Sequence, residues 1–328
     1  MGVLFKADQP AVRGYDRAMP GQANMRDTVA GMETVDRNLK IAVAIATSGR
    51  RDVLTQTILF LNRQTLKPDE LLVCPAKPAD VDLEGIAAYD GEVRVISGPV
   101  GLPHQRNALM AASDADIMLF LDDDFLPAPN YLEELKQLLC DDPTIVVATG
   151  FVVRDGAQGI GLGYEESVEI LAKDVYRKPK NVRPTFNAYG CNMCIRLTTA
   201  RRHGVRFDEN LPLYAWLEDV DFSRELAAYG RVVKASHLRG VHMGTKVGRT
   251  PGKRLGYSQV ANRIYLKRKG NISWLQAWDG ILHNVGANLF KSLRPEPWVD
   301  RRGRLAGNMA AFKDLLQGTL VPGKILDM

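Results

Sequence analysis

The sequence contains few cysteines and no long apolar run, and both absences narrow the kind of protein that it can encode. Four cysteines in 328 residues are too few for a disulfide scaffold, so a reducing compartment suits the chain. No stretch approaches the roughly 18 uninterrupted apolar residues of a membrane span. Residues 1–8 lack the basic and apolar segments of a secretory signal. We therefore expect a cytoplasmic protein.

The sequence also lacks nucleic-acid-binding motifs, although its charge is unevenly distributed. Residues 231–328 carry 18 Lys and Arg against 5 Asp and Glu, whereas the whole chain has a net charge of only +5. This basic part could face nucleic acid, an anionic membrane surface or a phosphate-bearing substrate. No zinc-finger spacing or RNA-binding aromatic signature accompanies it, so we expect no nucleic-acid partner.

Alternating strand-like and helical patterns predict an α/β domain. Strands that alternate with helices imply a parallel sheet with right-handed crossovers. The patterns predict strands at 40–47, 70–74, 93–97, 117–125, 144–153 and 186–196, and helices at 52–64, 103–112, 131–140, 218–229 and 272–293. Residues 1–37 show no sustained periodicity, so we expect an irregular N-terminal arm there.

Three adjacent carboxylates, Asp122 to Asp124, end the apolar run that begins at Ile117. Their mutual repulsion costs stability, and nothing in the folding of a strand requires them there. If the chain stays extended, Asp122 and Asp124 point to one side and Asp123 to the other. This pair would offer hard oxygen ligands to a cation at the carboxyl end of a strand, where open sheets bind ligands. The alternative is a solvated acidic turn before the next helix.

Three later features also have both a functional and a structural explanation. Glu218 and Asp219 open a predicted helix, where acidic side chains stabilise the helix dipole in any case. His242 precedes a glycine-containing basic stretch that could close over phosphates, whereas a lone histidine is more often structural or solvated. The four glycines between 156 and 163 could cradle a phosphate, although no P-loop Lys-Ser/Thr pair follows them.

Taken in order, these motifs resemble those of family 2 glycosyltransferases. The matching residues are Thr47-Ser48, Arg106-Asn107, Leu121-Asp122-Asp123-Asp124, Gly190-x-Asn192-Met193, Phe207-Asp208-Glu209 and Glu218-Asp219-Val220-Asp221. The resemblance covers about residues 38–245 and implies an α/β GT-A (nucleotide-diphospho-sugar transferase) fold, with a mixed, mostly parallel central sheet flanked by helices. It implies a nucleotide-binding half at 38–125 and an acceptor half at 126–245. Residues 246–328 would form a basic loop and a helical C-terminal extension.

The resemblance also implies roles for individual residues in an inverting transferase that uses a nucleotide-diphosphate sugar and Mn²⁺ or Mg²⁺. The metal ligands would be Asp124, Asp122 and His242, with Asp122 shared with the nucleotide. Asp219 would be the general base, and Glu218 would orient the acceptor. The residues expected to contact the nucleotide are Thr47, Arg50, Arg106, Asp122, Asp123, Arg249 and Lys253.

Two departures from the family pattern affect what we expect of the donor nucleotide and of the number of sugars added. Many members place a uracil-binding Asp after the second strand, but residues 74–77 contain none, so UDP, dTDP and GDP all stay open. The membrane spans and the Gln-x-x-Arg-Trp motif of processive synthases are absent, so we expect a hexosyltransferase that adds one sugar per encounter. Its acceptor would be a carbohydrate or a lipid-linked saccharide in bacterial surface polysaccharide or glycolipid synthesis.

The helix predicted at 272–293 carries apolar side chains along one face. That face would dock on the catalytic domain or attach the enzyme peripherally to the cytoplasmic side of an anionic inner membrane. The oligomeric state stays open. Two alternatives to the transferase are a sugar-phosphate nucleotidyltransferase, disfavoured by the short loop after the first strand, and a non-catalytic carbohydrate-binding relative, disfavoured by the complete acidic set.

Overall fold

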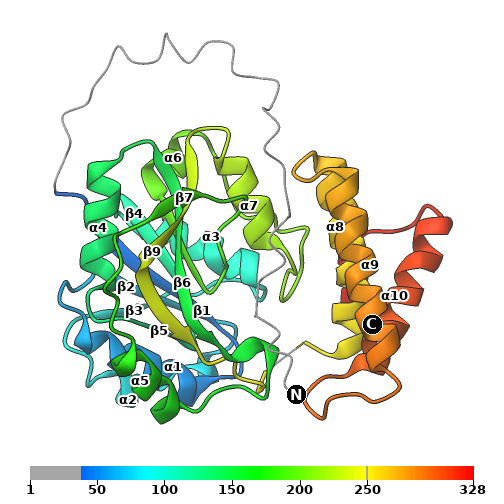
Figure 1. Ribbon diagram of the computed structural model, residues 1–328, viewed down its shortest axis with the longest axis horizontal. Helices are drawn as coiled ribbons and strands as arrows, with labels where there is room; N and C mark the ends of the chain where they lie inside the picture. The colour runs from blue at the N-terminus through cyan, green and yellow to red at the C-terminus, as the bar shows by residue number, and fades with distance from the viewer. Residues whose placement is uncertain (1–37, 249) are drawn as a thin grey trace, which may run out of the picture. The chain divides into compact units, whose positions relative to one another are not determined.

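The computed structural model describes residues 38–328 except Arg249, and these residues belong to one compact unit, Arg37–Met328. The arm predicted at 1–37 and the predicted nucleotide contact Arg249 lie outside the described residues. A nine-stranded sheet lies at the centre of the described part, with helices on both of its faces (Figure 1).

The elements follow one another along the chain as strands and helices in alternation. The strands are β1 (Ile41–Thr47), β2 (Glu70–Pro75), β3 (Val93–Val95), β4 (Ile117–Asp122), β5 (Phe125–Pro127), β6 (Ile145–Asp155), β7 (Val182–Pro184), β8 (Asn192–Arg196) and β9 (Arg231–His242). The α-helices are α1 (Arg51–Phe60), α2 (Leu83–Ile86), α3 (Leu102–Ala112), α4 (Tyr131–Asp141), α5 (Tyr164–Lys173), α6 (Leu197–Arg202), α7 (Glu218–Leu226), α8 (Gly252–Lys269), α9 (Trp274–Lys291) and α10 (Arg301–Leu316). Short 3₁₀ helices are η1 (Leu61–Arg63), η2 (Pro78–Asp80), η3 (Gly156–Gln158) and η4 (Pro322–Asp327).

The sheet is mixed, as predicted, and its parallel part comes first in the chain. The strand order is β3-β2-β1-β4-β8-β6-β9-β5, with β7 paired to β9. The first four strands run parallel, which brings the carboxyl ends of β1 and β4 together and places Ala46 opposite Asp122. β8 is antiparallel to both of its neighbours, whereas β6 and β9 are parallel.

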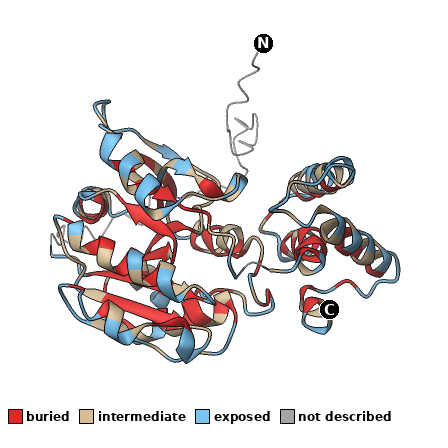
Figure 2. Cartoon of the chain, turned by 90° about the horizontal axis from the view of Figure 1, so that it is seen from below, coloured by how far each residue is buried: buried red, intermediate tan, exposed pale blue. Residues whose placement is uncertain are grey.

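Both faces of the sheet are buried, which explains the uninterrupted apolar runs of β1 and β4. Side chains alternate along β1, so Val43 and Ile45 pack in the apolar cluster on one face and Ala42 and Ala44 in the cluster on the other. Residues of α1 and α4 complete the first cluster, and residues of α3, α6 and α7 complete the second. Figure 2 shows these buried layers in red.

The structure corrects the prediction for the end of β4. The strand stops at Asp122, and a turn at Asp123 and Asp124 precedes β5, so an extended chain through Phe125 is wrong. The Thr57 hydroxyl on α1 donates a hydrogen bond to the Asp123 carbonyl at 2.7 Å. This hydrogen bond holds the turn against α1, and the three carboxylates lie at the end of the sheet.

A helical C-terminal region follows the sheet, as predicted. Apolar residues of α8, α9 and α10 form a cluster of their own. Lys269 at the end of α8 contacts the carboxylates of Asp208 at 2.8 Å and Asp221 at 2.7 Å, so both acidic residues have a structural role. Within the described residues, none of the helices combines the length and the apolar composition that crossing a bilayer requires.

Candidate active site

Asp123 lies in the turn after β4 and contacts residues that follow β1. Its Oδ2 accepts a hydrogen bond from the Thr47 hydroxyl at 2.6 Å, and its Oδ1 accepts one from Arg50 Nη1 at 2.9 Å. Burial raises the pKa of Asp123 to about 7, against the opposing effect of Arg50. Three of the residues predicted to bind the nucleotide therefore contact one another at the carboxyl ends of parallel strands, where such sheets bind ligands.

Arg50 also donates hydrogen bonds to the segment after β9, and these hold that segment at the carboxyl end of β1. Its Nε donates to the Val247 carbonyl at 2.8 Å, and its Nη2 donates to the Thr245 carbonyl at 3.2 Å. The Thr245 N–H in turn donates to Asp124 Oδ2 at 2.8 Å. The start of the predicted basic loop, residues 245–247, is therefore held against the turn that contains Asp123 and Asp124. Lys253 lies further along the chain, at the start of α8, and is exposed.

The three residues predicted as metal ligands converge on the other side of the turn. Ligand atoms of Asp122, Asp124 and His242 lie within 4.8 Å of one another. His242 Nε2 is 3.2 Å from Asp124 Oδ1 and 3.8 Å from Asp122 Oδ2. Asp124 Oδ1 is buried, yet no group in the described part of the chain makes a well-aligned hydrogen bond to it. Two carboxylates and an imidazole suit Mn²⁺ or Mg²⁺, and such a cation would satisfy this oxygen.

His242 is oriented by a carboxylate that the sequence did not point to. Its Nδ1 is 2.9 Å from Asp155 Oδ1, and the Tyr189 hydroxyl donates to Asp155 Oδ2 at 3.0 Å. Burial by itself would lower the pKa of His242, but its contacts with Asp124 and Asp155 raise it to about 10. The imidazolium therefore neutralises the carboxylates when no cation is bound, and a metal ion must displace that proton.

We expect Asp155→Asn to weaken Mn²⁺ binding by about 10- to 100-fold, because the carboxylate fixes the ring and increases its basicity as a ligand. The asparagine side-chain oxygen can still accept a hydrogen bond from His242 Nδ1, so the change removes the negative charge and keeps the orientation of the ring. Titration of the metal-free protein by calorimetry measures the affinity without turnover. Tyr189→Phe, which removes only the hydrogen bond to Asp155, should cause a smaller loss. Unchanged affinity in Asp155→Asn would show that the carboxylate does not orient a ligand.

Close backbone packing explains Gly156, one of the four glycines between 156 and 163. A Cβ on Gly156 would lie 2.0 Å from the Met243 carbonyl oxygen, and one on Gly244 would lie 2.1 Å from the Ala157 nitrogen. Lys246 Nζ donates to the Gly156 carbonyl at 3.0 Å. Glycine at positions 156 and 244 therefore lets the backbone after β6 pack directly against the backbone after β9.

The second pair of acids, Glu218 and Asp219, begins α7 after a strained turn. Leu213, Ala215 and Leu217 have φ angles of 58°, 51° and 73°, in the left-handed region that non-glycine residues rarely occupy. Each such residue costs on the order of 1 kcal/mol, and such strain is typically retained at functional sites. The turn positions the first residues of α7 against the segment before β8.

Asp219 faces the backbone of Gly190, within one of the motifs that carry the family resemblance. Its Oδ2 accepts the Gly190 N–H at 3.0 Å, and its Oδ1 accepts the Val220 N–H at 2.8 Å. A Cβ on Gly190 would lie 3.3 Å from Glu218 Oε1, so glycine permits this close approach. Burial raises the pKa of Asp219, which makes its carboxylate a stronger base than an exposed aspartate.

Arg106 lies between the acidic turn after β4 and the acidic pair at the start of α7. The guanidinium is 2% exposed, and it donates to Glu218 Oε1 at 2.7 Å and to the Gly190 carbonyl at 2.9 Å. Its Nη2 also lies 3.5 Å from Asp122 Oδ1. Burial raises the pKa of Glu218 to about 8 despite the opposing effect of Arg106. The sequence suggested that Arg106 binds the nucleotide, whereas its contacts here position the carboxylates of both groups.

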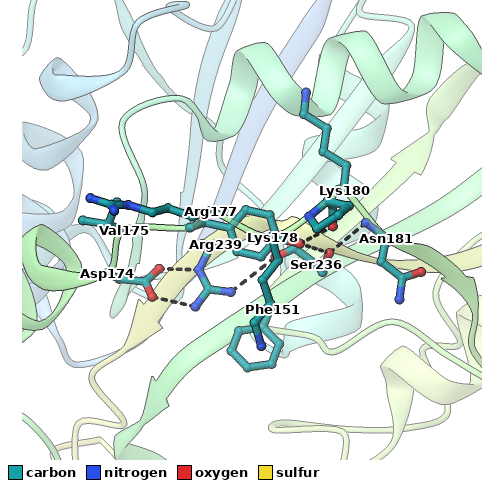
Figure 3. Close-up of a pocket in the computed structure, with 11 residues that line it drawn as sticks. Phe151, Asp174, Val175, Arg177, Lys178, Lys180, Asn181, Ser236 and Arg239 are labelled. Atoms are coloured by element: carbon teal, nitrogen blue, oxygen red, sulfur yellow. Dashed lines mark hydrogen bonds and ion pairs between the residues drawn. The ribbon is translucent and has the colours of Figure 1, made fainter.

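A separate pocket of about 790 Å³ lies elsewhere and contains none of the predicted site residues. It is lined by the segment between α5 and β7 together with residues of β6 and β9 (Figure 3). Arg239 projects into it, paired with Asp174 and positioned over the rings of Phe151 and Tyr176. Asp174 neutralises the charge of Arg239. We therefore take the cluster of Asp122, Asp124 and His242, and not this pocket, as the candidate active site.

Comparisons with known proteins agree with this geometry. Residues 42–199 match the model of the family described as glycosyl transferase family 2. Among solved structures, the fold is similar to that of S. aureus TarS residues 1–349, with a TM-score of 0.54 and 14% sequence identity over 88% of this chain and 82% of that chain. No curated protein sequence matches the chain. The chain therefore carries a glycosyl transferase family 2 domain in a GT-A-like fold, and the protein is a glycosyltransferase.

Proposed function

We propose that the protein is a metal-dependent inverting glycosyltransferase, in which Asp219 is the general base and Asp122, Asp124 and His242 hold Mn²⁺ or Mg²⁺. The observation that carries the proposal is the bridge through Arg106, which contacts both Asp122 and Glu218. The bridge couples a cation site to a pair of acids at the start of α7. A nucleotidyltransferase has no need of a base there, and the family of the domain favours sugar transfer.

The reaction would proceed by direct displacement at the anomeric carbon. Asp219 takes the proton of the acceptor hydroxyl as the acceptor oxygen bonds to that carbon, and the bond from the carbon to the diphosphate oxygen breaks. A bound divalent cation supplies neutralisation of the charge that grows on the leaving diphosphate. Glu218, held by Arg106 at 2.7 Å, orients the acceptor beside the base.

The nucleotide would lie at the carboxyl ends of β1 and β4. Thr47, Arg50 and Asp123 are joined there by hydrogen bonds, and open α/β sheets bind nucleotides at this position. Lys253, exposed at the start of α8, and Arg249 would contact the phosphates. The acceptor would approach the turn before α7, where Tyr214 is 54% exposed and close to Trp216. Exposed aromatic rings of this kind suit a carbohydrate or a lipid-linked saccharide, and we propose transfer of one hexose in surface polysaccharide or glycolipid synthesis.

A panel of UDP-, dTDP- and GDP-hexoses with Mn²⁺ or Mg²⁺ tests the proposal. We expect one nucleotide diphosphate to raise the melting temperature only when the metal is present, because the metal and the nucleotide share Asp122. Slow hydrolysis of the matching sugar donor should appear in the same samples. If no nucleotide diphosphate stabilises the protein with either metal, the metal-dependent transferase is wrong.

A further inference from the structure

Helix α9 (Trp274–Lys291) carries large apolar side chains that the rest of the described chain does not cover. Six of them are between 39% and 75% exposed, and Leu293, just after the helix, is 80% exposed. Figure 2 shows pale-blue stretches along the helices of the C-terminal region. These residues, which we call the α9 stripe, are Trp274, Leu275, Trp278, Leu282, Leu289, Phe290 and Leu293. Isolated exposed apolar residues are ordinary, but a contiguous set of this size indicates an interaction surface.

The α9 stripe is distinct from the face by which α9 packs on the protein. Both Ala277 and Ile281 are fully buried: Ile281 packs in the cluster of α8 and α10, and Ala277 packs in a cluster that includes Leu211 and Ala215 of the turn before α7. Successive residues of an α-helix turn by about 100°, which places Trp274, Trp278 and Leu282 on an arc beside this buried face. Helix α9 thus docks on the catalytic domain and on its helical neighbours by the face of Ala277 and Ile281, and the α9 stripe is a neighbouring face that these contacts leave exposed.

Cationic side chains border the α9 stripe. Lys267 Nζ lies 5.2 Å from the ring centre of Trp274 at one end. At the other end Arg294 is exposed, and Lys291 is half-exposed and paired with Glu296 at 2.7 Å. The helix carries only one other charged residue, Asp279. Tryptophan and leucine beside lysine and arginine is the composition of helices that lie in the plane of a membrane surface.

The α9 stripe could bind either a membrane or a second copy of the chain, and the charge of this region favours the membrane. Residues 231–328 carry 18 Lys and Arg against 5 Asp and Glu, so two copies joined through the stripe would bring two cationic surfaces together. An anionic bilayer surface instead attracts such a region and accepts the apolar side chains. We propose that α9 docks the protein on an anionic lipid surface, with the α9 stripe inserted at the level of the lipid headgroups.

Vesicle sedimentation of the full chain tests this proposal, using phosphatidylcholine vesicles with and without phosphatidylserine. We expect binding to the phosphatidylserine vesicles that weakens as salt is added. The double variant Leu282→Asp/Phe290→Asp should reduce the partition coefficient about tenfold or more, because it places charge in the inserted face. Leu316→Asp/Leu326→Asp is the matched control, since both residues are exposed in the same region but lie outside the α9 stripe.

Three results would overturn the proposal. The first is that the unaltered chain fails to bind phosphatidylserine vesicles. The second is that the stripe variant and the control lose the same amount of binding, which would make the effect one of net charge. The third is that light scattering shows an oligomer that the stripe variant alone converts to a monomer, which would assign the stripe to a second copy. Circular dichroism of each variant checks that the helices are retained.

Discussion

Asp219→Asn is expected to slow sugar transfer by about 100- to 10,000-fold, the usual contribution of a general base. Asparagine can still accept the Gly190 N–H that Asp219 accepts at 3.0 Å, so the start of α7 should keep its place. The substituted amide cannot take the proton of the acceptor hydroxyl. Transfer is measured with the donor that the nucleotide panel identifies, and donor binding is measured by calorimetry in the same variant.

Asp208→Asn is the matched control for that experiment. Asp208 belongs to another acidic motif of the resemblance, and the structure pairs it with Lys269 at 2.8 Å and shows no contact between it and Asp219 among the described residues. Its loss should lower the melting temperature and leave kcat close to that of the unaltered enzyme. Near-normal transfer by Asp219→Asn would exclude Asp219 as the base, whereas normal donor binding with no transfer would support it.

The second large effect concerns pH, because the metal-free site buries acids whose pKa values are raised. Burial raises the pKa of Asp123 to about 7 and that of Glu218 to about 8. The folded protein thus binds more protons than the unfolded chain between the ordinary and the raised pKa values. Each group then lowers the free energy of unfolding by up to about 1.4 kcal/mol per pH unit as pH rises through this window. The raised pKa of His242 acts in the same direction at higher pH.

We therefore expect the protein in EDTA to lose stability as the pH rises from about 6 to about 8. Mn²⁺ at about 100 times its dissociation constant should add about 2.7 kcal/mol, with a larger gain at the upper pH, where less proton displacement opposes binding. Urea unfolding at several pH values measures both effects. Glu218→Gln should flatten the pH dependence in EDTA. If the free energy of unfolding in EDTA rises between about pH 6 and about pH 8, the raised pKa values of Asp123 and Glu218 are wrong.

Much of the fold follows from local patterns in the sequence. The apolar runs at 41–47 and 117–121 correspond to buried strands. Both faces of the sheet are covered, and this selects β-branched and other apolar residues along these runs. The end of β4 was predicted less well. The turn after Asp122 receives a hydrogen bond at the Asp123 carbonyl from Thr57, 66 positions before Asp123, and no local pattern contains that contact.

The sequence by itself identified the candidate residues of the site. It predicted Asp122, Asp124 and His242 as one cluster, and the order of the motifs indicated the family. Only the tertiary structure decided how these residues are held. Asp155 orients His242 from a strand end 87 positions earlier, and Arg106 reaches Glu218 across 112 positions. Such contacts arise when strands and helices pack, so their geometry is a property of the assembled sheet and not of any local segment. The exposure of the α9 stripe was decided in the same way, because one apolar helical pattern serves equally for burial in the core and for contact with a membrane.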